Sequence, residues 1–144
     1  MADEERIVEI LKDVPLFSGL KRRQLHSLAH LFIERQCKAN EVIVPQGREG
    51  YGFFVLVSGK AEAIRERADG SKTVVNTFGP NGFFGEMALI DSGPRTASVI
   101  ATEPTRCLIL PRENFLGVLR RDGDMAVEIM VELVKRFRAA LESF

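Results

Sequence analysis

The chain has 144 residues, of which 45% are hydrophobic, and its 20 basic and 20 acidic side chains give a formal charge of zero. This length suits one domain with its own hydrophobic core, and the charge balance argues against a general nucleic-acid binder, which would carry a basic surplus. No apolar run reaches the roughly 20 residues that span a bilayer. The acidic N-terminus, MADEER, lacks the apolar segment of a secretory signal. We therefore expect a cytoplasmic protein without membrane insertion.

Two amphipathic helices are predicted at the start of the chain, within residues 4–32. Apolar residues recur at helical spacing over residues 4–13, and Pro15 then ends this helix. A second helix with one apolar face follows over about residues 21–32. It carries His26 and His30 four residues apart, the spacing of a two-histidine metal clamp. The neighbouring sequence offers no third ligand, so we expect no metal site.

Between residues 33 and 110 the apolar period changes to two, which indicates strands. The predicted strands are 33–37, 41–45, 53–58, 60–67, 72–78, 97–101 and 105–110. Asp69 and Gly70 favour a hairpin turn between two of them. Many short strands at this spacing are typical of a jelly-roll barrel.

After Pro111 the helical pattern returns, with a short helix over 112–121 and a longer one over 125–142. The longer helix carries one apolar stripe: Ala126, Met130, Leu133, Phe137 and Leu141. We therefore predict a single α+β domain of residues 1–144, an antiparallel jelly-roll β-barrel over 33–110 flanked by N-terminal and C-terminal helices.

Residues 84–99, FGEMALIDSGPRTASV, combine groups suited to a small anion that also carries hydroxyl groups. Gly85 lets a backbone N–H approach a ligand closely, because no Cβ stands in the way. The guanidinium fork of Arg95 fits phosphate oxygens. Glu86 can accept a hydrogen bond from a sugar hydroxyl, and Thr96 adds a donor beside the arginine. The alternative is a surface ion pair between Glu86 and Arg95, worth about 0–1 kcal/mol.

This run resembles the phosphate-binding cassette of cyclic nucleotide-binding domains, the family of the catabolite activator protein, kinase regulatory subunits and cyclic-nucleotide-gated channels. Two further segments are similar to that family: PLFSGL at residues 15–20, which resembles its entry turn, and GFFVLVSG at residues 52–59, which resembles its glycine-bounded strand. The resemblance covers about residues 14–138.

The resemblance implies a set of ligand-binding residues: Gly85, Glu86, Met87, Ala88, Arg95, Thr96 and Ala97. Glu86 would bind the ribose 2′-hydroxyl, and Arg95 would neutralise the cyclic phosphate. Thr96 and the backbone N–H of Ala97 would add hydrogen bonds to the phosphate. The N–H groups of residues 85, 87 and 88 would face the ligand at a short helical turn, where unpaired amides favour an anion.

Contacts to the base are expected from the last helix. In channel-type members of the family an arginine there touches the purine, and the matching position is Arg136. Phe137 could stack on the ring instead, with core packing as the alternative, and the alternative for Arg136 is a solvated charge. Phe78 is a further candidate on the base side of the barrel.

The expected function is that of a non-catalytic sensor that binds cAMP, or else cGMP, with closure of the last helix over the base as its output. Thr96 can support guanine, but no acid is expected to face the guanine edge, so the sequence favours cAMP. We expect no cofactor and no metal. Catalysis is disfavoured because the predicted barrel contains no histidine, the commonest general base.

Two other functions stay open: a degenerate family member that acts as a protein-interaction module without nucleotide, and a barrel metalloenzyme. The sequence ends at Phe144, just after the predicted helix 125–142, which leaves no room for a helix-turn-helix, so we expect no direct binding to nucleic acid. A downstream protein or a fused effector domain is the expected partner, and the sequence leaves the oligomeric state open.

Overall fold

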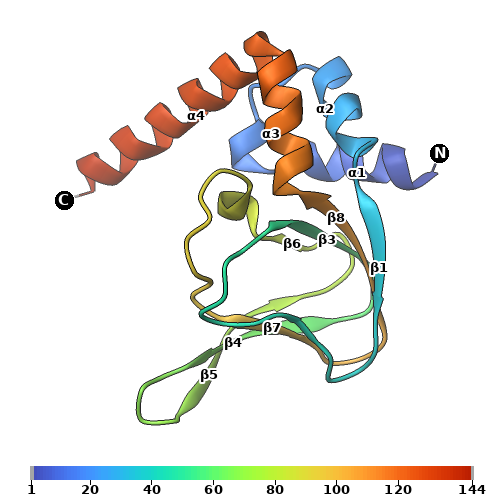
Figure 1. Ribbon diagram of the computed structural model, residues 1–144, viewed down its shortest axis with the longest axis vertical. Coiled ribbons are helices and arrows are strands. Elements are labelled where there is room, and N and C mark those ends of the chain that lie inside the picture. The colour runs from blue at the N-terminus through green and yellow to red at the C-terminus, as the bar shows by residue number, and fades with distance from the viewer. Residues whose placement is uncertain (1, 144) are drawn as a thin grey trace. The chain divides into compact units, whose positions relative to one another are not determined.

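The computed structural model describes residues 2–143, which form two compact units (Figure 1). The helical unit contains the chain up to Leu31 and from Glu113 onward, and the strand unit contains Phe32–Arg112. The order along the chain is helices, strands, helices, which confirms the predicted α+β class.

The helical unit is held together by apolar side chains that recur at helical spacing. Its elements are α1 (Ala2–Lys12), the 3₁₀-helix η1 (Pro15–Phe17), α2 (Arg22–Ala29), α3 (Arg112–Arg121, whose first residue belongs to the strand unit) and α4 (Gly123–Glu142). Leu11, Leu28 and Phe115 are fully buried. The rings of Phe17 and Phe115 lie 5.9 Å apart and pack η1 against α3. The sequence predicts these helices because their apolar faces are continuous.

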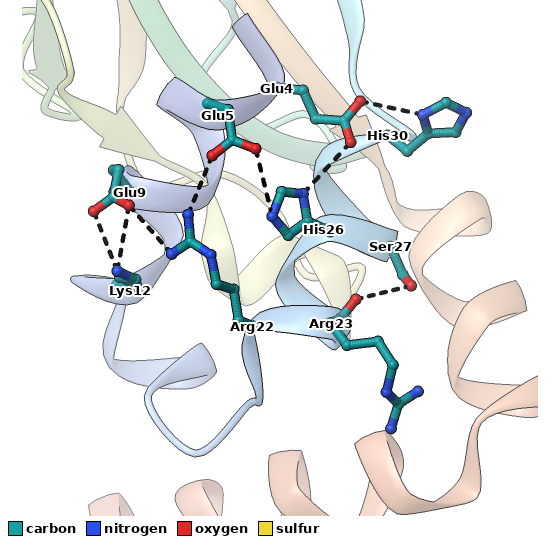
Figure 2. Close-up of polar contacts among 9 residues, drawn as sticks. All are labelled: Glu4, Glu5, Glu9, Lys12, Arg22, Arg23, His26, Ser27 and His30. Carbon is teal, nitrogen blue, oxygen red and sulfur yellow. Dashed lines mark hydrogen bonds and ion pairs between the residues drawn. The ribbon is translucent and has the colours of Figure 1, made fainter. Parts of the chain in front are cut away.

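Charged side chains also join α1 to α2 (Figure 2). The Arg22 guanidinium lies 3.1 Å from a Glu5 carboxylate oxygen and 3.3 Å from one of Glu9. The two nitrogens of the His26 ring face carboxylates of Glu4, at 3.6 Å, and Glu5, at 3.5 Å. These groups are partly or largely exposed, so water and salt screen their attraction.

The strand unit consists of two four-stranded antiparallel sheets. The strands are β1 (Ile33–Cys37), β2 (Val42–Val44), β3 (Gly52–Ser58), β4 (Ala61–Glu66), β5 (Lys72–Phe78), β6 (Phe83–Phe84), β7 (Ser98–Ala101) and β8 (Thr105–Pro111), with the 3₁₀-helix η2 (Glu86–Leu89) after β6. The strand orders are β1-β8-β3-β6 and β2-β7-β4-β5. This is a jelly-roll arrangement, in which β4 and β5 pair as consecutive strands and the other pairs join strands distant in the chain. Asp69 and Gly70 form the predicted hairpin between β4 and β5.

The sheets differ from the prediction in one respect: the strand pairing of the described residues does not close them into a barrel. Each sheet has one short edge strand: β6, with two residues, in the first sheet, and β2, with three residues, in the second. Such strands offer few N–H and C=O groups for pairing from one sheet to the other. An isolated antiparallel bridge between Glu49 and Pro94 links the loop before β3 to the segment before β7.

The core of the strand unit lies between the two sheets, and β3 supplies its centre. Gly52 through Val57 are all buried, because β3 has a paired strand on each side and is covered on both faces. Phe54 and Leu56 point into the cluster between the sheets, whereas Phe53 packs beside the rings of Phe32 and Phe83. This double burial explains why the sequence of β3 is a continuous apolar run.

The long helix α4 has apolar residues on more than one side. Met125 and Ile129 are buried, whereas Met130, Phe137 and Leu141 of the predicted stripe are more than half exposed. Phe137 is 64% exposed, so core packing of its ring is not observed. Within residues 2–143, no helix combines the length and apolar character needed to cross a membrane.

The structure predicts that packing, more than ion pairing, holds α1 and α2 together. We expect Arg22→Ala to lower the free energy of unfolding by less than about 1 kcal/mol, because its partners are exposed. We expect Leu28→Ala to lower it by about 2–5 kcal/mol, because it leaves a cavity at a fully buried position. Urea denaturation of both variants measures this difference, and equal losses would contradict it.

Candidate functional site

A cavity of about 430 Å³ lies in the strand unit between η2 and the segment that leads into β7. It is lined by Gly85, Glu86, Met87, Ala88, Asp91, Gly93, Pro94, Arg95 and Thr96. Its volume falls within the range of small-molecule sites, about 300–1,000 Å³. Six of the seven predicted ligand-binding residues line it, and the seventh, Ala97, packs against the core between the sheets instead.

Arg95 is the charged group that defines the cavity. Its Nη2 donates to the carbonyl of Gly52 at 3.1 Å. Its Cζ lies 5.8 Å from the ring centre of Phe54 and 6.0 Å from that of Phe84, two rings stacked on each other at 4.8 Å. Its Nε is buried without a hydrogen-bond partner, and no ion pair joins Arg95 to a carboxylate within the described residues. No carboxylate of the described residues therefore lies at ion-pair distance from the Arg95 charge, although Glu86 and Asp91 line the same cavity.

The burial of Arg95 has an electrostatic consequence. Desolvation lowers the pKa of the Arg95 guanidinium from its ordinary value, because the surrounding protein stabilises the charge less well than water does. An arginine nevertheless stays charged near neutral pH. An anion beside Arg95 would supply the missing stabilisation of this charge.

Two glycines give the guanidinium its space. Gly85 has a φ of +88°, and a Cβ there would lie 2.7 Å from the carbonyl oxygen of Gly52 and 2.9 Å from both terminal nitrogens of Arg95. A Cβ on Gly50 would lie 2.7 Å from Nε of Arg95. Any larger residue at either position would displace the arginine. The sequence singled out Gly85 but not Gly50, because an isolated glycine in a loop carries no specific signal.

The backbone holds Arg95 in place from the other side. The Arg95 N–H donates to the carbonyl of Arg48, and its carbonyl accepts from the N–H of Gly47, both at 2.9 Å. The carbonyl of Thr96 accepts a longer bond, 3.4 Å, from Nε of Arg65. The segment that carries the arginine is thus anchored to the loop before β3.

The turn η2 forms the opposite wall of the cavity. Glu86 is half-buried at its first position, with Oε2 shielded from solvent. The N–H of Ala88 donates to the carbonyl of Gly85 at 3.0 Å. In this structure the Ala88 amide, which the sequence analysis expected to face a ligand, is therefore engaged within the turn.

The predicted base contacts lie outside the residues that line the cavity. Phe78 packs on Phe84, with ring centres 5.1 Å apart, and so extends the aromatic cluster beside Arg95. Arg136 and Phe137 belong to α4 in the helical unit. Their contact with a base stays a prediction.

His26 in α2 and His30, the residue that caps its C-terminal end, have an acidic neighbour that is not evident from the sequence around them. Glu4 Oε2 lies 3.3 Å from Nδ1 of His30, and this contact is the main cause that lowers the pKa of the Glu4 carboxyl. Glu4 also faces His26 because the fold pairs α1 with α2, which are distant in sequence (Figure 2). Across residues 2–143, no group of three His, Cys, Asp or Glu side chains is arranged to hold a metal ion.

The chain is similar in sequence to proteins of known family. The family model of the cyclic nucleotide-binding domain matches residues 34–122. The cyclic AMP receptor protein of Thermus thermophilus is 34% identical over 130 residues, which cover 90% of this chain and 60% of that protein. A cAMP-dependent protein kinase regulatory subunit of Yarrowia lipolytica is 36% identical over 118 residues, 80% of this chain and 30% of the subunit. The chain thus spans less than two thirds of the length of these curated relatives.

A solved structure shares the fold of this chain. The N-terminal domain of a transcriptional regulator from Streptomyces coelicolor superposes with a TM-score of 0.83 at 25% identity, covering 93% of this chain and 94% of that domain. The resemblance seen in the sequence is therefore confirmed, and it extends to the three-dimensional fold.

The isolated charge of Arg95 predicts that this residue contributes little to folding. Arg95→Met removes the buried charge but keeps an apolar chain against Phe54 and Phe84. We expect its free energy of unfolding, measured in urea without nucleotide, to stay within about 1 kcal/mol of the parent or to exceed it. Arg67→Met, on the exposed β4–β5 hairpin, is the control. A loss above about 3 kcal/mol for Arg95→Met alone would show that the arginine is structural.

Proposed function

This chain belongs to the cyclic nucleotide-binding domain family, and we propose that it is a regulatory domain that binds cAMP beside Arg95 and catalyses no reaction. The observation that carries the proposal is the half-buried guanidinium of Arg95, which lacks a carboxylate partner among the described residues and lines a cavity of suitable volume. A cyclic phosphate matches this group in charge and in hydrogen-bond geometry. The named ligands of two relatives, cyclic AMP in both cases, support the choice of nucleotide.

Each wall of the cavity takes one part of the ligand. The phosphate binds the fork of Arg95 and the hydroxyl of Thr96. The ribose lies toward η2, where Glu86 accepts a hydrogen bond from the 2′-hydroxyl. The backbone amides of Gly85, Met87 and Ala97 add hydrogen-bond donors on the phosphate side.

The base is contacted by α4. Phe137 offers an exposed ring for stacking, and Arg136 lies next to it on the same helix. Movement of α4 over the base is the output, and it requires that the nucleotide bind the closed state better than the open one. A downstream protein or a fused effector domain receives this signal. Adenine needs only an apolar slot and a stacking partner, so cAMP is preferred over cGMP, and a competition titration with both nucleotides tests this preference.

The assignment to Arg95 is tested by calorimetric titration with cAMP. We expect Arg95→Ala to weaken binding by about 2–5 kcal/mol, because the buried phosphate loses its charged partner. Arg95→Lys restores only part of this loss, since an ammonium cannot replace the planar fork. Arg67→Ala should bind as the parent does. A parent protein that binds neither nucleotide would leave the chain as an interaction module.

The role of Glu86 is tested with a modified ligand. We expect Glu86→Gln to weaken cAMP binding by about 1–3 kcal/mol, because the charge-assisted acceptor is lost. For 2′-deoxy-cAMP the parent and the variant should bind almost equally, since the hydroxyl is absent from the ligand. If the substitution weakens both ligands to the same extent, Glu86 does not contact the 2′-hydroxyl.

A further inference from the structure

Arg112 makes a set of contacts that the site described above does not use. Its Nη1 donates to the carbonyl of Gly50 at 2.7 Å and to that of Ala88 at 3.3 Å. Its Nη2 pairs with Glu49 at 2.7 Å, and its backbone N–H donates to the carbonyl of Tyr51 at 2.7 Å. The side chain is only 15% exposed. We name these four contacts the Arg112 clasp.

The clasp joins three segments that are far apart in sequence. Glu49, Gly50 and Tyr51 belong to the loop before β3, and Ala88 belongs to η2. Arg112 itself ends the strand unit and begins α3. The clasp therefore fixes the wall of the cavity to the residue from which α3 starts, although Arg112 does not line the cavity.

Gly50 connects the clasp to Arg95. Its carbonyl accepts from Arg112, while its Cα lies so close to Arg95 that an added Cβ would be 2.7 Å from Nε. The same Cβ would be 2.8 Å from that of Ala88. A shift of the loop at Gly50 must therefore move Arg95, Ala88 or both, because there is no empty space between groups packed at these distances.

The carbonyl contacts, more than the ion pair, give the clasp its strength. The Glu49 side chain is 60% exposed, so solvent screens its pairing with Arg112. The carbonyls of Gly50 and Ala88 lie on buried residues and receive charge-assisted bonds from one guanidinium. Both carbonyls accept from the same nitrogen, Nη1, while Nη2 faces Glu49. An ammonium group does not reproduce this fixed planar geometry.

We propose that Arg112 is the positioning residue that holds η2 and the Gly50 loop in the arrangement that accepts phosphate, and that links this arrangement to the start of α3. The linkage to a ligand rests on the nucleotide binding proposed above, whereas the positioning of η2 does not. Because linkage is reciprocal, a change at Arg112 alters nucleotide affinity, and nucleotide binding alters the local stability at Arg112.

The positioning role is tested without nucleotide by amide hydrogen exchange on the full chain. The N–H groups of Ala88 and Ile90 donate within η2, to Gly85 and Met87, and report its opening. We expect Arg112→Ala to speed their exchange about tenfold and Arg112→Lys to speed it less, while the Gly70 amide of the β4–β5 turn is unchanged. Unchanged exchange at Ala88 and Ile90 in both variants overturns the proposal.

A partner variant separates the carbonyl contacts from the ion pair. Glu49→Gln keeps the shape of the side chain but removes its charge, and we expect exchange in η2 close to that of the parent. If Glu49→Gln speeds exchange as much as Arg112→Ala, the surface ion pair and not the carbonyl contacts holds the turn, which overturns the proposal. If Arg112→Ala shows no cooperative unfolding transition and so is not properly folded, the comparison of Arg112→Lys with Glu49→Gln still decides between the carbonyl contacts and the ion pair.

The linkage is tested by titration with cAMP. We expect Arg112→Ala to weaken binding about tenfold although Arg112 lies outside the cavity, with Arg67→Ala as the matched arginine control. We expect cAMP to slow exchange of the first α3 amides in the parent but not in Arg112→Ala. If Arg112→Ala binds cAMP as tightly as the parent and cAMP slows its α3 amide exchange as much as in the parent, the linkage is overturned. A parent that binds no nucleotide refutes the proposed function, while the exchange measurements without nucleotide still decide the positioning role.

Discussion

The half-buried guanidinium of Arg95 is the constraint on which the rest of the site depends. A charge in this position needs a carbonyl to receive one of its protons, aromatic faces to lie against and space for its planar group. Gly52 supplies the carbonyl, and the stacked rings of Phe54 and Phe84 supply the faces. The space exists only because no Cβ is present at Gly85 or Gly50, so the backbone around the cavity is shaped by the side chain of one residue.

Much of the fold could be predicted because each element has a period or a turn signal of its own. The strands of the sheets alternate or form short apolar runs, and Gly70, with a φ of +87°, closes the hairpin that Asp69-Gly70 predicts. The strand β6 was missed, because two residues are too few to show a period. The open edges of the sheets could not be predicted either, since closure depends on pairing between distant strands and not on any local pattern.

The site divides in the same way between local and distant contributions. All nine residues that line the cavity come from one continuous stretch between Gly85 and Thr96, and such a stretch can be recognised as a unit. Gly50 and Arg112 come from segments more than 15 residues away on either side, and nothing in their own surroundings marks them. The exposure of Phe137 could likewise not be predicted, because an apolar stripe on a helix does not show whether the rest of the protein packs against it.

Arg95 has no ion-paired carboxylate within the described residues, and this explains how the binding free energy of an anion can stabilise one conformation of the site. A carboxylate from the protein would stabilise the arginine in every state, and an arriving phosphate would then have to displace it. Without such a partner, the stabilisation of the charge comes with the anion, and it stabilises the arrangement in which Arg95, Gly50 and η2 are correctly placed. The desolvation that lowers the pKa of Arg95 is therefore a cost of the free protein that ligand binding offsets. Contacts that maintain this arrangement, such as the Arg112 clasp, decide how the binding free energy is used. Firm contacts let it stabilise the start of α3, whereas loose contacts let the loop move locally instead.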